Sequence, residues 1–330
     1  MFYKGKNVLV AGGAGMIGQS LVRKLLDEGA YVRATQYRSR KITLTHKNLE
    51  VVSCDLRNDD EARPLFKDME IVFLAAAEVA GAKIIKEDPS RIIMSDLELH
   101  ARLIHLAAKT GAAKCAFISS SYVYPHTGRP NKEEEGFQGD PWKPTNYGLG
   151  WMRRYLETLC KHFQMTSRTG YAVIRPTAIY GPYDKFNLEE SHVIPALILK
   201  AVNRMNPFEV WGNGEDVRSF TYSDDVAEGL MLVVEKYAVA EAINICTKET
   251  HTVKEVVKIL FNYLEFHPQV LFSTDKPSLI PYKVSDSSRA RELLGWEARV
   301  GLEEGLKRTV DWYLEYRESS RSASSTGVVS

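Results

Sequence analysis

Three glycines near the start of the chain, Gly12, Gly15 and Gly18, have the spacing that suits a phosphate-binding turn. An apolar run at residues 8–11 precedes them and is typical of a buried strand. A helical pattern follows, with apolar residues on one face at Ile17, Leu21, Leu25 and Leu26. Such a turn places pyrophosphate against free N–H groups at the start of a helix. This context favours a dinucleotide site, over an ordinary glycine-rich turn, at Gly12, Gly15, Met16 and Ile17.

The end of the second expected strand selects between the two nicotinamide dinucleotides. In NAD binders an acidic residue at this point accepts hydrogen bonds from the adenine ribose. This chain has Gln36 there, followed by Arg38 and Arg40. A neutral amide does not repel a 2′-phosphate, and a guanidinium can pair with it in a forked geometry. We therefore expect NADP(H) in preference to NAD(H), bound beside Gln36 and Arg38. The alternative is a basic surface turn.

Two further segments are expected beside the cofactor. Asp55 and Leu56 follow the third expected strand, where the Asp55 carboxylate can accept a hydrogen bond from the adenine amino group. Ala75 and Ala76 lie in a run of small residues that lets backbone approach the cofactor where larger side chains would collide.

Strand and helix patterns alternate through about residue 175. Strands are predicted at residues 7–11, 31–35, 49–53, 71–75, 115–119 and 171–174, and helices at 17–28, 91–109 and 147–163. This alternation predicts an α/β fold with a Rossmann-type, doubly wound parallel sheet. We assign residues 1–176, with returning segments near 215–247, to the dinucleotide-binding domain. Residues 177–317 are assigned mainly to a smaller C-terminal α/β substrate-binding lobe, and the Ser-rich segment 318–330 to a disordered tail.

The composition of the chain argues against nucleic-acid-binding and membrane proteins. Hydrophobic residues make up 44% and charged residues 26% of the chain, an ordinary globular balance. A net charge of +1 gives no electrostatic footprint for nucleic acid or an anionic membrane. No apolar run reaches transmembrane length, and the glycine turn begins too early for a signal peptide. Four widely spaced cysteines fit reduced thiols better than disulfides or zinc ligands, so we expect a cytoplasmic protein without a bound metal.

The chain resembles the extended short-chain dehydrogenase/reductase family of nucleotide-sugar epimerases, dehydratases and reductases over about residues 5–315. The motifs that carry the resemblance are the glycine turn and the segments 119–125, 175–182 and 211–225, with Tyr147. Segments 180–186 and 191–197 resemble a branch that acts on GDP-linked keto sugars. The resemblance implies an NAD(P)-dependent enzyme of nucleotide-sugar biosynthesis. It would oxidise or reduce C4 of a GDP-hexose or GDP-heptose, with epimerisation at a single carbon as a further option.

The resemblance implies that Tyr147 is the catalytic acid/base and that Ser120 holds the same substrate oxygen. The family usually has a lysine four residues after this tyrosine, whose charge lowers the tyrosine pKa. Trp151 stands at that position here, and indole supplies one neutral donor and no charge. Arg154, a further turn along the same face, could compensate in part; the alternative is a surface arginine.

A second difference from the family pattern concerns the residues that remove a proton from the carbon beside the keto group. The branch uses a cysteine base and a histidine acid to invert two carbons. His192 matches the acid, but Tyr122 stands at the cysteine position. A phenol is a poor base unless its surroundings change its pKa. The hypothesis is that double epimerisation is lost or altered while redox at C4 or a single-site step survives. His192 could instead be a satisfied core histidine.

The resemblance also implies a substrate site between the two parts of the chain. Arg218 and Lys283 correspond to contacts with the diphosphate and ribose. Ala178 replaces an asparagine of the branch, and Lys185 another polar residue. The implied substrate set also contains the base-flanking Trp211 and Val193, with Val79, Gly81, Ser121, Tyr122 and His192. The implied cofactor set is completed by Tyr147, Trp151, Pro176, Ala178 and Ile179.

Two function classes remain open from the sequence. One is the GDP-sugar enzyme, and the other is a catalytically degenerate protein that binds cofactor and nucleotide sugar without turnover. Trp151 and Tyr122 favour the second class, while the retained site residues favour the first. The resemblance also implies a homodimer in which helices 91–109 and 147–163 form a four-helix bundle. Apolar contacts there, or alternatively against the sheet, would come from Leu97, Leu103, Ile104 and Leu156.

Overall fold

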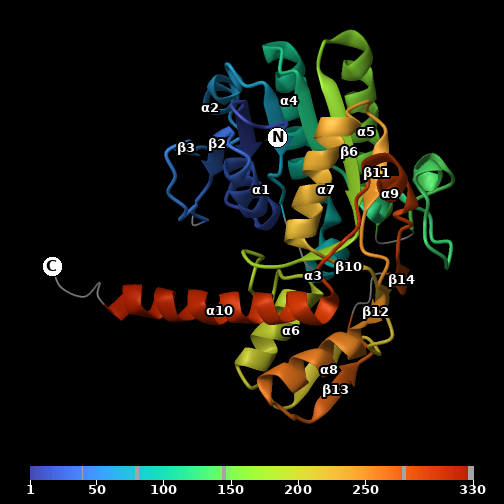
Figure 1. The fold of residues 1–330 in the computed structure, drawn as a ribbon. Coiled ribbons are helices and arrows are strands. Elements are labelled where there is room, and N and C mark those ends of the chain that lie inside the picture. Colours follow the sequence, from blue (N-terminus) through green and yellow to red (C-terminus); the bar gives the residue numbers. More distant parts are fainter. Residues whose placement is uncertain (39, 79–81, 143–145, 277–279, 326–330) are drawn as a thin grey trace.

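The structure is a computed structural model that describes residues 1–38, 40–78, 82–142, 146–276 and 280–325. Figure 1 shows a layered α/β part and, below it, a smaller lobe. The main sheet has the order β11-β6-β5-β4-β1-β2-β3, and every neighbouring pair is parallel. Its strands are β1 (Asn7–Ala11), β2 (Tyr31–Gln36), β3 (Leu49–Ser53), β4 (Ile71–Leu74), β5 (Lys114–Ile118), β6 (Gly170–Pro176) and β11 (Ala242–Ile245). The predicted Rossmann-type sheet is confirmed.

Helices cover both faces of this sheet. On one face α1 (Met16–Asp27) packs against α7 (Ser223–Lys236), with α9 (Ser288–Leu294) beside α7. On the other face α4 (Pro89–Thr110) packs against α5 (Tyr147–Thr166). Shorter helical segments are α2 (Asp59–Ala62), η1 (Arg63–Phe66), α3 (Ala82–Glu87), η2 (Ser121–Val123) and η3 (Glu133–Phe137).

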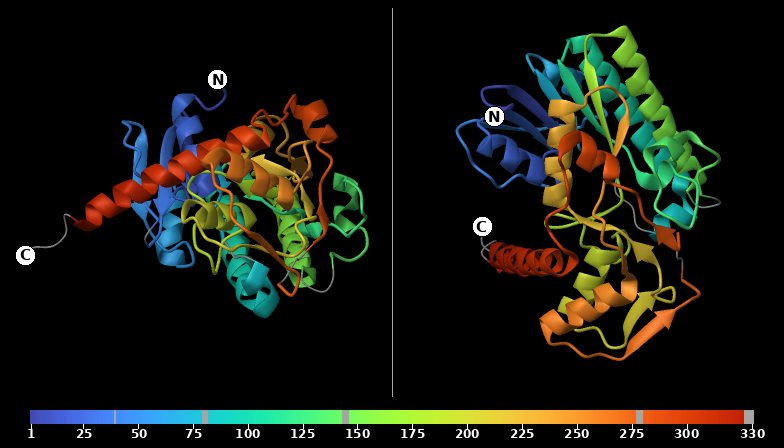
Figure 2. Two further views of the ribbon diagram at one scale, coloured as in Figure 1. Left: turned by 90° about the horizontal axis from the view of Figure 1, so that it is seen from below. Right: turned by 45° about the vertical axis from the view of Figure 1, so that its right-hand side comes forward.

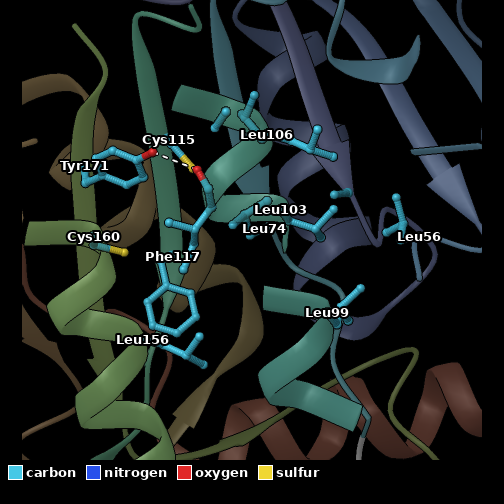
Figure 3. Close-up of a cluster of buried hydrophobic side chains, with 14 of the residues drawn as sticks. Leu56, Leu74, Leu99, Leu103, Leu106, Cys115, Phe117, Leu156, Cys160 and Tyr171 are labelled. Carbon is cyan, nitrogen blue, oxygen red and sulfur yellow. Dashed lines mark hydrogen bonds between the residues drawn. The ribbon is translucent and has the colours of Figure 1, made fainter. Parts of the chain in front are cut away.

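Local signals set the ends of α4. The Asp88 side chain caps its start by accepting from the Arg91 N–H, and Pro89 occupies the first turn. Gly111 ends the helix with a φ of 76°, a left-handed conformation that glycine adopts without strain. Between these ends, Leu103 and Ile104 are fully buried. Figure 3 shows Leu103 and Leu156 beside Phe117 in the core that α4 and α5 form with the sheet, where the Tyr171 hydroxyl donates to the Ile104 carbonyl at 2.8 Å.

The burial of these side chains decides which way they face on the two helices that were expected to form a dimer. Leu103, Ile104 and Leu156 are 0% exposed and face the sheet, so they are unavailable to a partner subunit, and Leu97 is partly buried against the same core. The solvent side of the same two helices instead carries large apolar side chains, including Met94 and Tyr155, which are 52% and 54% exposed.

The lobe is built from three small sheets and three helices. β7 (Ala178–Tyr180) pairs with β10 (Phe220–Tyr222), and β8 (Phe208–Trp211) pairs with β13 (Val270–Ser273). β9 (Val217–Arg218) lies between β12 (His251–Thr252) and β14 (Tyr282–Lys283). The helices are α6 (Val193–Val202), α8 (Val253–Leu264) and α10 (Leu302–Ser325).

Helix α10 begins in the core of the lobe and leaves it. Leu306 and Val310 are buried, whereas Tyr316 is 55% exposed, and Figures 1 and 2 show the C-terminal half projecting away from both parts. Its aromatic residues also contact the loop that follows β7: Phe186 stacks on Tyr313 at 4.3 Å between ring centroids. The helix continues to Ser325, so residues 318–325 are helical where a disordered tail was expected. An amphipathic start anchored in the core supports helix beyond the point where the periodic pattern ends.

Within the described ranges, no helix has the length and apolar character needed to cross a bilayer. The same residues contain no group of three His, Cys, Asp or Glu side chains arranged to hold a metal ion. All four cysteines are free and buried.

Candidate functional site

The turn between β1 and α1 leaves no room for a side chain at two of its glycines. Gly12 has a φ of 91°, and a Cβ there would lie 2.3 Å from the backbone nitrogen of Ala76. A Cβ on Gly18 would lie 2.1 Å from the Gly12 carbonyl oxygen. These two glycines therefore allow β1, the start of α1 and the segment after β4 to approach one another closely.

Gly15 differs because the protein leaves space beside it. A Cβ there would meet only the carbonyl oxygens of Gly12, at 3.4 Å, and Ala75, at 4.0 Å. Its φ of −80° and ψ of 169° are open to any residue. Gly15 also precedes α1, whose start has no side-chain cap, so N–H groups of the first turn are left for a ligand. The turn thus fits a dinucleotide pyrophosphate, which would lie against Gly15, Met16 and Ile17.

Basic side chains surround the end of β2, where the adenine ribose of a cofactor is expected. Arg38 and Arg57 both contact the Tyr37 ring, at 4.9 and 5.5 Å from its centroid. Arg57 binds the Asp55 carboxylate through two N–H groups, at 2.9 and 2.7 Å, and this holds the pKa of Asp55 well below its usual range. Asp55 is therefore ionised and already engaged, while Arg38 forms no ion pair with any of the described residues.

Two other residues expected at the cofactor have structural partners. The Gln36 side chain donates to the Ser53 hydroxyl at 2.9 Å and accepts from the Ile42 N–H at 3.1 Å, which fixes the loop after β2. Leu56 is 8% exposed and packs in the core beneath α4, so only its backbone is left to face a cofactor.

Ser120 and Tyr147 lie at the carboxyl end of β5, where η2 packs against α5. Ser120 caps η2, its hydroxyl accepting from the Tyr122 N–H at 3.2 Å. Tyr147 is the first residue of α5 and is 40% exposed. Trp151 lies one turn later, 42% exposed, with its ring centroid 6.3 Å from that of Tyr147. The helix thus presents an indole where the family presents an ammonium group.

The suggestion that Arg154 compensates for this exchange is wrong. Arg154 is 2% exposed, and its guanidinium donates to the Val123 carbonyl at 2.7 and 3.1 Å and to the Gly139 carbonyl at 2.7 Å. It also lies against Trp151, 4.6 Å from the ring centroid. Since burial and these carbonyls hold the guanidinium in place, Arg154 fixes the loops next to α5.

A buried ion pair joins β6 to α5. Glu157 of α5 and Arg175 of β6 have side chains 2% and 3% exposed, and they meet through two hydrogen bonds of 2.9 and 2.7 Å. The Ser119 hydroxyl donates to the same carboxylate at 2.5 Å. This network positions Ser120 relative to α5. The sequence signal for it was a glutamate within the apolar face of a helix, together with an arginine at the end of an apolar strand.

A second buried pair, also missed from the sequence, lies between α4 and α5. The Arg153 guanidinium donates to the Asp96 carboxylate at 2.5 Å, and their side chains are 13% and 2% exposed. Asp96 also accepts from the Glu78 N–H at 3.0 Å. Arg153 is near enough to Tyr122 for its positive charge to lower the pKa of the phenol.

On the lobe side, Arg218 and Lys283 are neighbours across β9 and β14 and lie in direct register. Arg218 pairs with Asp216 at 3.2 Å. The Lys283 Nζ lies 3.9 Å from the centroid of the Tyr122 ring, so this contact joins the lobe to the end of β5. Burial raises the pKa of Tyr122, although Arg218 and Arg153 act in the opposite direction, so the phenol is neutral near pH 7.

His192 precedes α6 and is open to solvent, so it is not a satisfied core histidine. Surrounding protein nevertheless lowers its pKa, an effect that Asp184 opposes and Lys283 and Lys185 reinforce. The Asp184 carboxylate is partly buried, and its Oδ2 atom has no hydrogen-bond partner. Asp184 and His192 are thus close enough for their charges to interact, a pairing that the sequence analysis did not predict.

The remaining expected residues are placed as follows. Lys185 forms an ion pair with Glu190, and Val193 is 37% exposed at the first turn of α6. The Trp211 indole donates to Glu209 at 3.2 Å at the end of β8. Ser121 is buried with an unpartnered hydroxyl, and Pro176, Ala178 and Ile179 follow one another at the end of β6 and in β7. Val79 and Gly81 lie outside the described residues.

A model of the NAD-dependent epimerase/dehydratase family matches residues 8–246 of the chain. The GDP-L-fucose synthase of Sinorhizobium fredii is 30% identical over 316 residues, which cover 94% of this chain and 96% of that protein. The solved epimerase Mth375 of Methanothermobacter thermautotrophicus has a TM-score of 0.85 at 25% identity, covering 97% of this chain and 95% of that one. The UDP-glucose 4-epimerase of Thermotoga maritima, solved with UDP-glucose, has a TM-score of 0.82 at 27% identity, covering 94% and 99%. Since the matched region takes in the glycine turn, Ser120 and Tyr147, this chain belongs to the NAD-dependent epimerase/dehydratase family.

Proposed function

We propose that this protein is an NAD(P)-dependent enzyme that oxidises or reduces C4 of a GDP-linked hexose or heptose. The observation that carries the proposal is the glycine at position 15, where a Cβ would make only ordinary contacts with the protein, at the same sheet edge as Ser120 and Tyr147. A relative 30% identical over 94% of this chain is named GDP-L-fucose synthase, which supports a GDP-sugar substrate.

The chain supplies a proton donor and an anchor for the sugar oxygen. A bound nicotinamide would exchange a hydride with the sugar carbon. Tyr147, exposed at the start of α5, would give a proton to the neighbouring oxygen or take one from it, and Ser120 would hold that oxygen by a hydrogen bond. No lysine follows Tyr147 by one turn, so the phenol lacks the positive charge that assists it elsewhere in the family.

Cations of the lobe support binding of a nucleoside diphosphate. Arg218, which lies in register with Lys283 on the adjacent strand, would offset the phosphate charge. Val193 and Trp211 lie at the ends of two lobe elements and would flank the base. Tyr122 stays neutral near pH 7 and is a poor base, which supports the hypothesis that double epimerisation is lost or altered. With GDP-4-keto-6-deoxymannose in deuterated water, deuterium at both C3 and C5 would refute that hypothesis.

For the cofactor we propose NADP(H). Arg38 and Arg57 flank Tyr37 beyond the end of β2, and the neutral Gln36 side chain faces Ser53. A 2′-phosphate would gain charge-assisted hydrogen bonds from these guanidinium groups. Replacing Arg38 by alanine should weaken NADPH binding by about tenfold and leave NADH binding within about twofold, as measured by titration. Equal losses for both cofactors would contradict this choice.

We also propose a homodimer that forms through the solvent side of α4 and α5. Met94 and Tyr155 are more than half exposed there, and Met165 is 77% exposed. Replacing Tyr155 by glutamate should convert a dimer into a monomer in sedimentation experiments. Four free, buried thiols support a reducing compartment, and we propose the cytoplasm.

Absorbance of the reduced nicotinamide band tests the main proposal. NADPH with GDP-4-keto-6-deoxymannose should lose absorbance in the presence of the protein, and replacing Tyr147 by phenylalanine should slow this at least about a hundredfold. A protein that binds without turnover would give no ligand-dependent change with any GDP-sugar. That result would favour the alternative of a binding protein without catalytic activity, and Trp151 is the residue that most favours this alternative.

A further inference from the structure

Lys283 is a partly buried amine that has no counter-ion. Within the described part of the chain no carboxylate lies at ion-pair distance from its Nζ atom, which lies instead over the face of the Tyr122 ring, 3.9 Å from the centroid. Its partner in register, Arg218, is itself a cation, and that guanidinium already pairs with Asp216 at 3.2 Å. The fold therefore holds two cations side by side and gives a carboxylate to only one of them.

This environment disfavours the charged form of Lys283. Burial and the nearby Arg218 lower its pKa from 10.5 to about 7, so a large share of the amine is unprotonated near neutrality. The groups that face it are Arg218 from β9, the neutral Tyr122 phenol from η2 and His192 before α6. An unprotonated amine is a Brønsted base, whereas Tyr122 beneath it is not one at this pH.

Lys283 also contacts the short helix that follows Ser120. Tyr122 lies two residues after Ser120 in the chain, and its N–H donates to the Ser120 hydroxyl at 3.2 Å. The amine over the Tyr122 ring thus lies against η2, the element that Ser120 caps. His192 is close enough for its charge to interact with that of Lys283.

We propose that the Lys283 amine removes the proton from the sugar carbon adjacent to the C4 ketone. This role rests on the proposed function and goes beyond it, because it assigns the base that Tyr122 fails to supply. The proton passes from carbon to the Lys283 nitrogen, and the C–H electron pair forms the C=C bond of an enolate. The negative charge moves to the former ketone oxygen, which the Ser120 and Tyr147 hydroxyls stabilise. Return of a proton to the same carbon restores the ketone, so no oxidant or reductant is consumed.

The competing role for Lys283 is that of a phosphate anchor, which needs only positive charge. An arginine at this position keeps the charge but never releases its proton, because its pKa exceeds 12. Lys283→Arg therefore separates the two roles. As a matched control, Lys248→Arg makes the same change at an exposed lysine whose Nζ pairs with Glu297 at 2.6 Å, outside the proposed site.

The experiment measures deuterium uptake into GDP-4-keto-6-deoxymannose in deuterated water without NADPH, at saturating substrate, by NMR. Wild type and Lys248→Arg should incorporate deuterium at a carbon beside the ketone. Lys283→Arg should do so at least about a hundredfold more slowly while binding GDP within about threefold of wild type. A second variant, Lys283→Ala, should lose exchange and regain part of it with added ethylamine.

The outcomes separate this inference from the proposed function. If Lys283→Arg exchanges deuterium at the wild-type rate at saturating substrate, Lys283 is an anchor only and the inference is overturned. If wild type consumes NADPH with the keto sugar but exchanges no deuterium, the inference fails while the proposed function stands. If wild type does neither, both fail.

Discussion

Replacing Gly15 by alanine should impair cofactor binding without harming the fold. In most glycine turns these two effects are mixed, but here the structure separates them. The new methyl group would meet carbonyl oxygens at 3.4 and 4.0 Å, which is ordinary van der Waals contact, and the backbone is in the extended region. The free energy of unfolding should therefore stay the same or rise by up to about 1 kcal/mol, because alanine restricts the unfolded chain.

The cofactor should bind more weakly because the methyl group occupies the space beside the first turn of α1. Moving a pyrophosphate away from those N–H groups loses at least one hydrogen bond to a charged oxygen, worth about 1.5–3 kcal/mol. That loss corresponds to a dissociation constant raised roughly 10- to 150-fold. Titration with NADPH, followed by its fluorescence, gives the constant, and urea unfolding gives the stability.

The control is the neighbouring glycine that the fold does require. Gly12→Ala forces a Cβ to 2.3 Å from the Ala76 nitrogen at a φ of 91°, so it should lower the unfolding free energy by at least about 2 kcal/mol. If a folded Gly15→Ala protein binds NADPH within about twofold of wild type, the assignment of this turn to the cofactor is refuted.

Three further outcomes follow from the same geometry. Glu157→Gln removes the negative charge beside the buried Arg175 guanidinium, so urea unfolding should show a loss of about 3–5 kcal/mol; a loss below 1 kcal/mol would contradict the pairing. Trp151→Lys places a cation one turn from Tyr147 and should raise the rate of NADPH oxidation at pH 7, whereas an unchanged rate would show that the missing charge is unimportant. Deuterium exchange should rise about fourfold from pH 6.5 to 8, because Lys283 loses its proton around pH 7. Over this range Arg218 stays charged, the Tyr122 phenol stays neutral and the His192 imidazole is largely neutral. A flat pH profile would oppose the assignment of Lys283 as the base.

The sheet was predictable from sequence because its signals are local. Apolar runs mark the buried strands, and the spacing from Gly12 to Gly18 marks the turn that follows the first of them. The last strand of the sheet, β11, comes from a segment far along the chain. The sequence predicted only that residues near 215–247 return to the dinucleotide-binding domain, and it did not locate the strand. A short buried strand has no distinctive spacing of apolar residues.

The polar contacts within the core were not predictable in the same way. The pairs Glu157–Arg175 and Asp96–Arg153 join different elements, and single-sequence periodicity does not say which buried charges meet. The prediction for Arg154 failed for a related reason. Its helical position was correct, but the carbonyls that bind its guanidinium belong to loops whose course no pattern in the sequence describes.

The aromatic contact between the loop after β7 and helix α10 has a consequence for synthesis of the chain. Tyr183 and Phe186 are made long before Trp312 and Tyr313, on which they rest. A ribosome releases the glycine turn and the first strands early, but the loop that leads to His192 gains these aromatic contacts only when the final helix has emerged. Chains shortened before that helix would retain the sheet that receives a dinucleotide and lose the sugar side of the site.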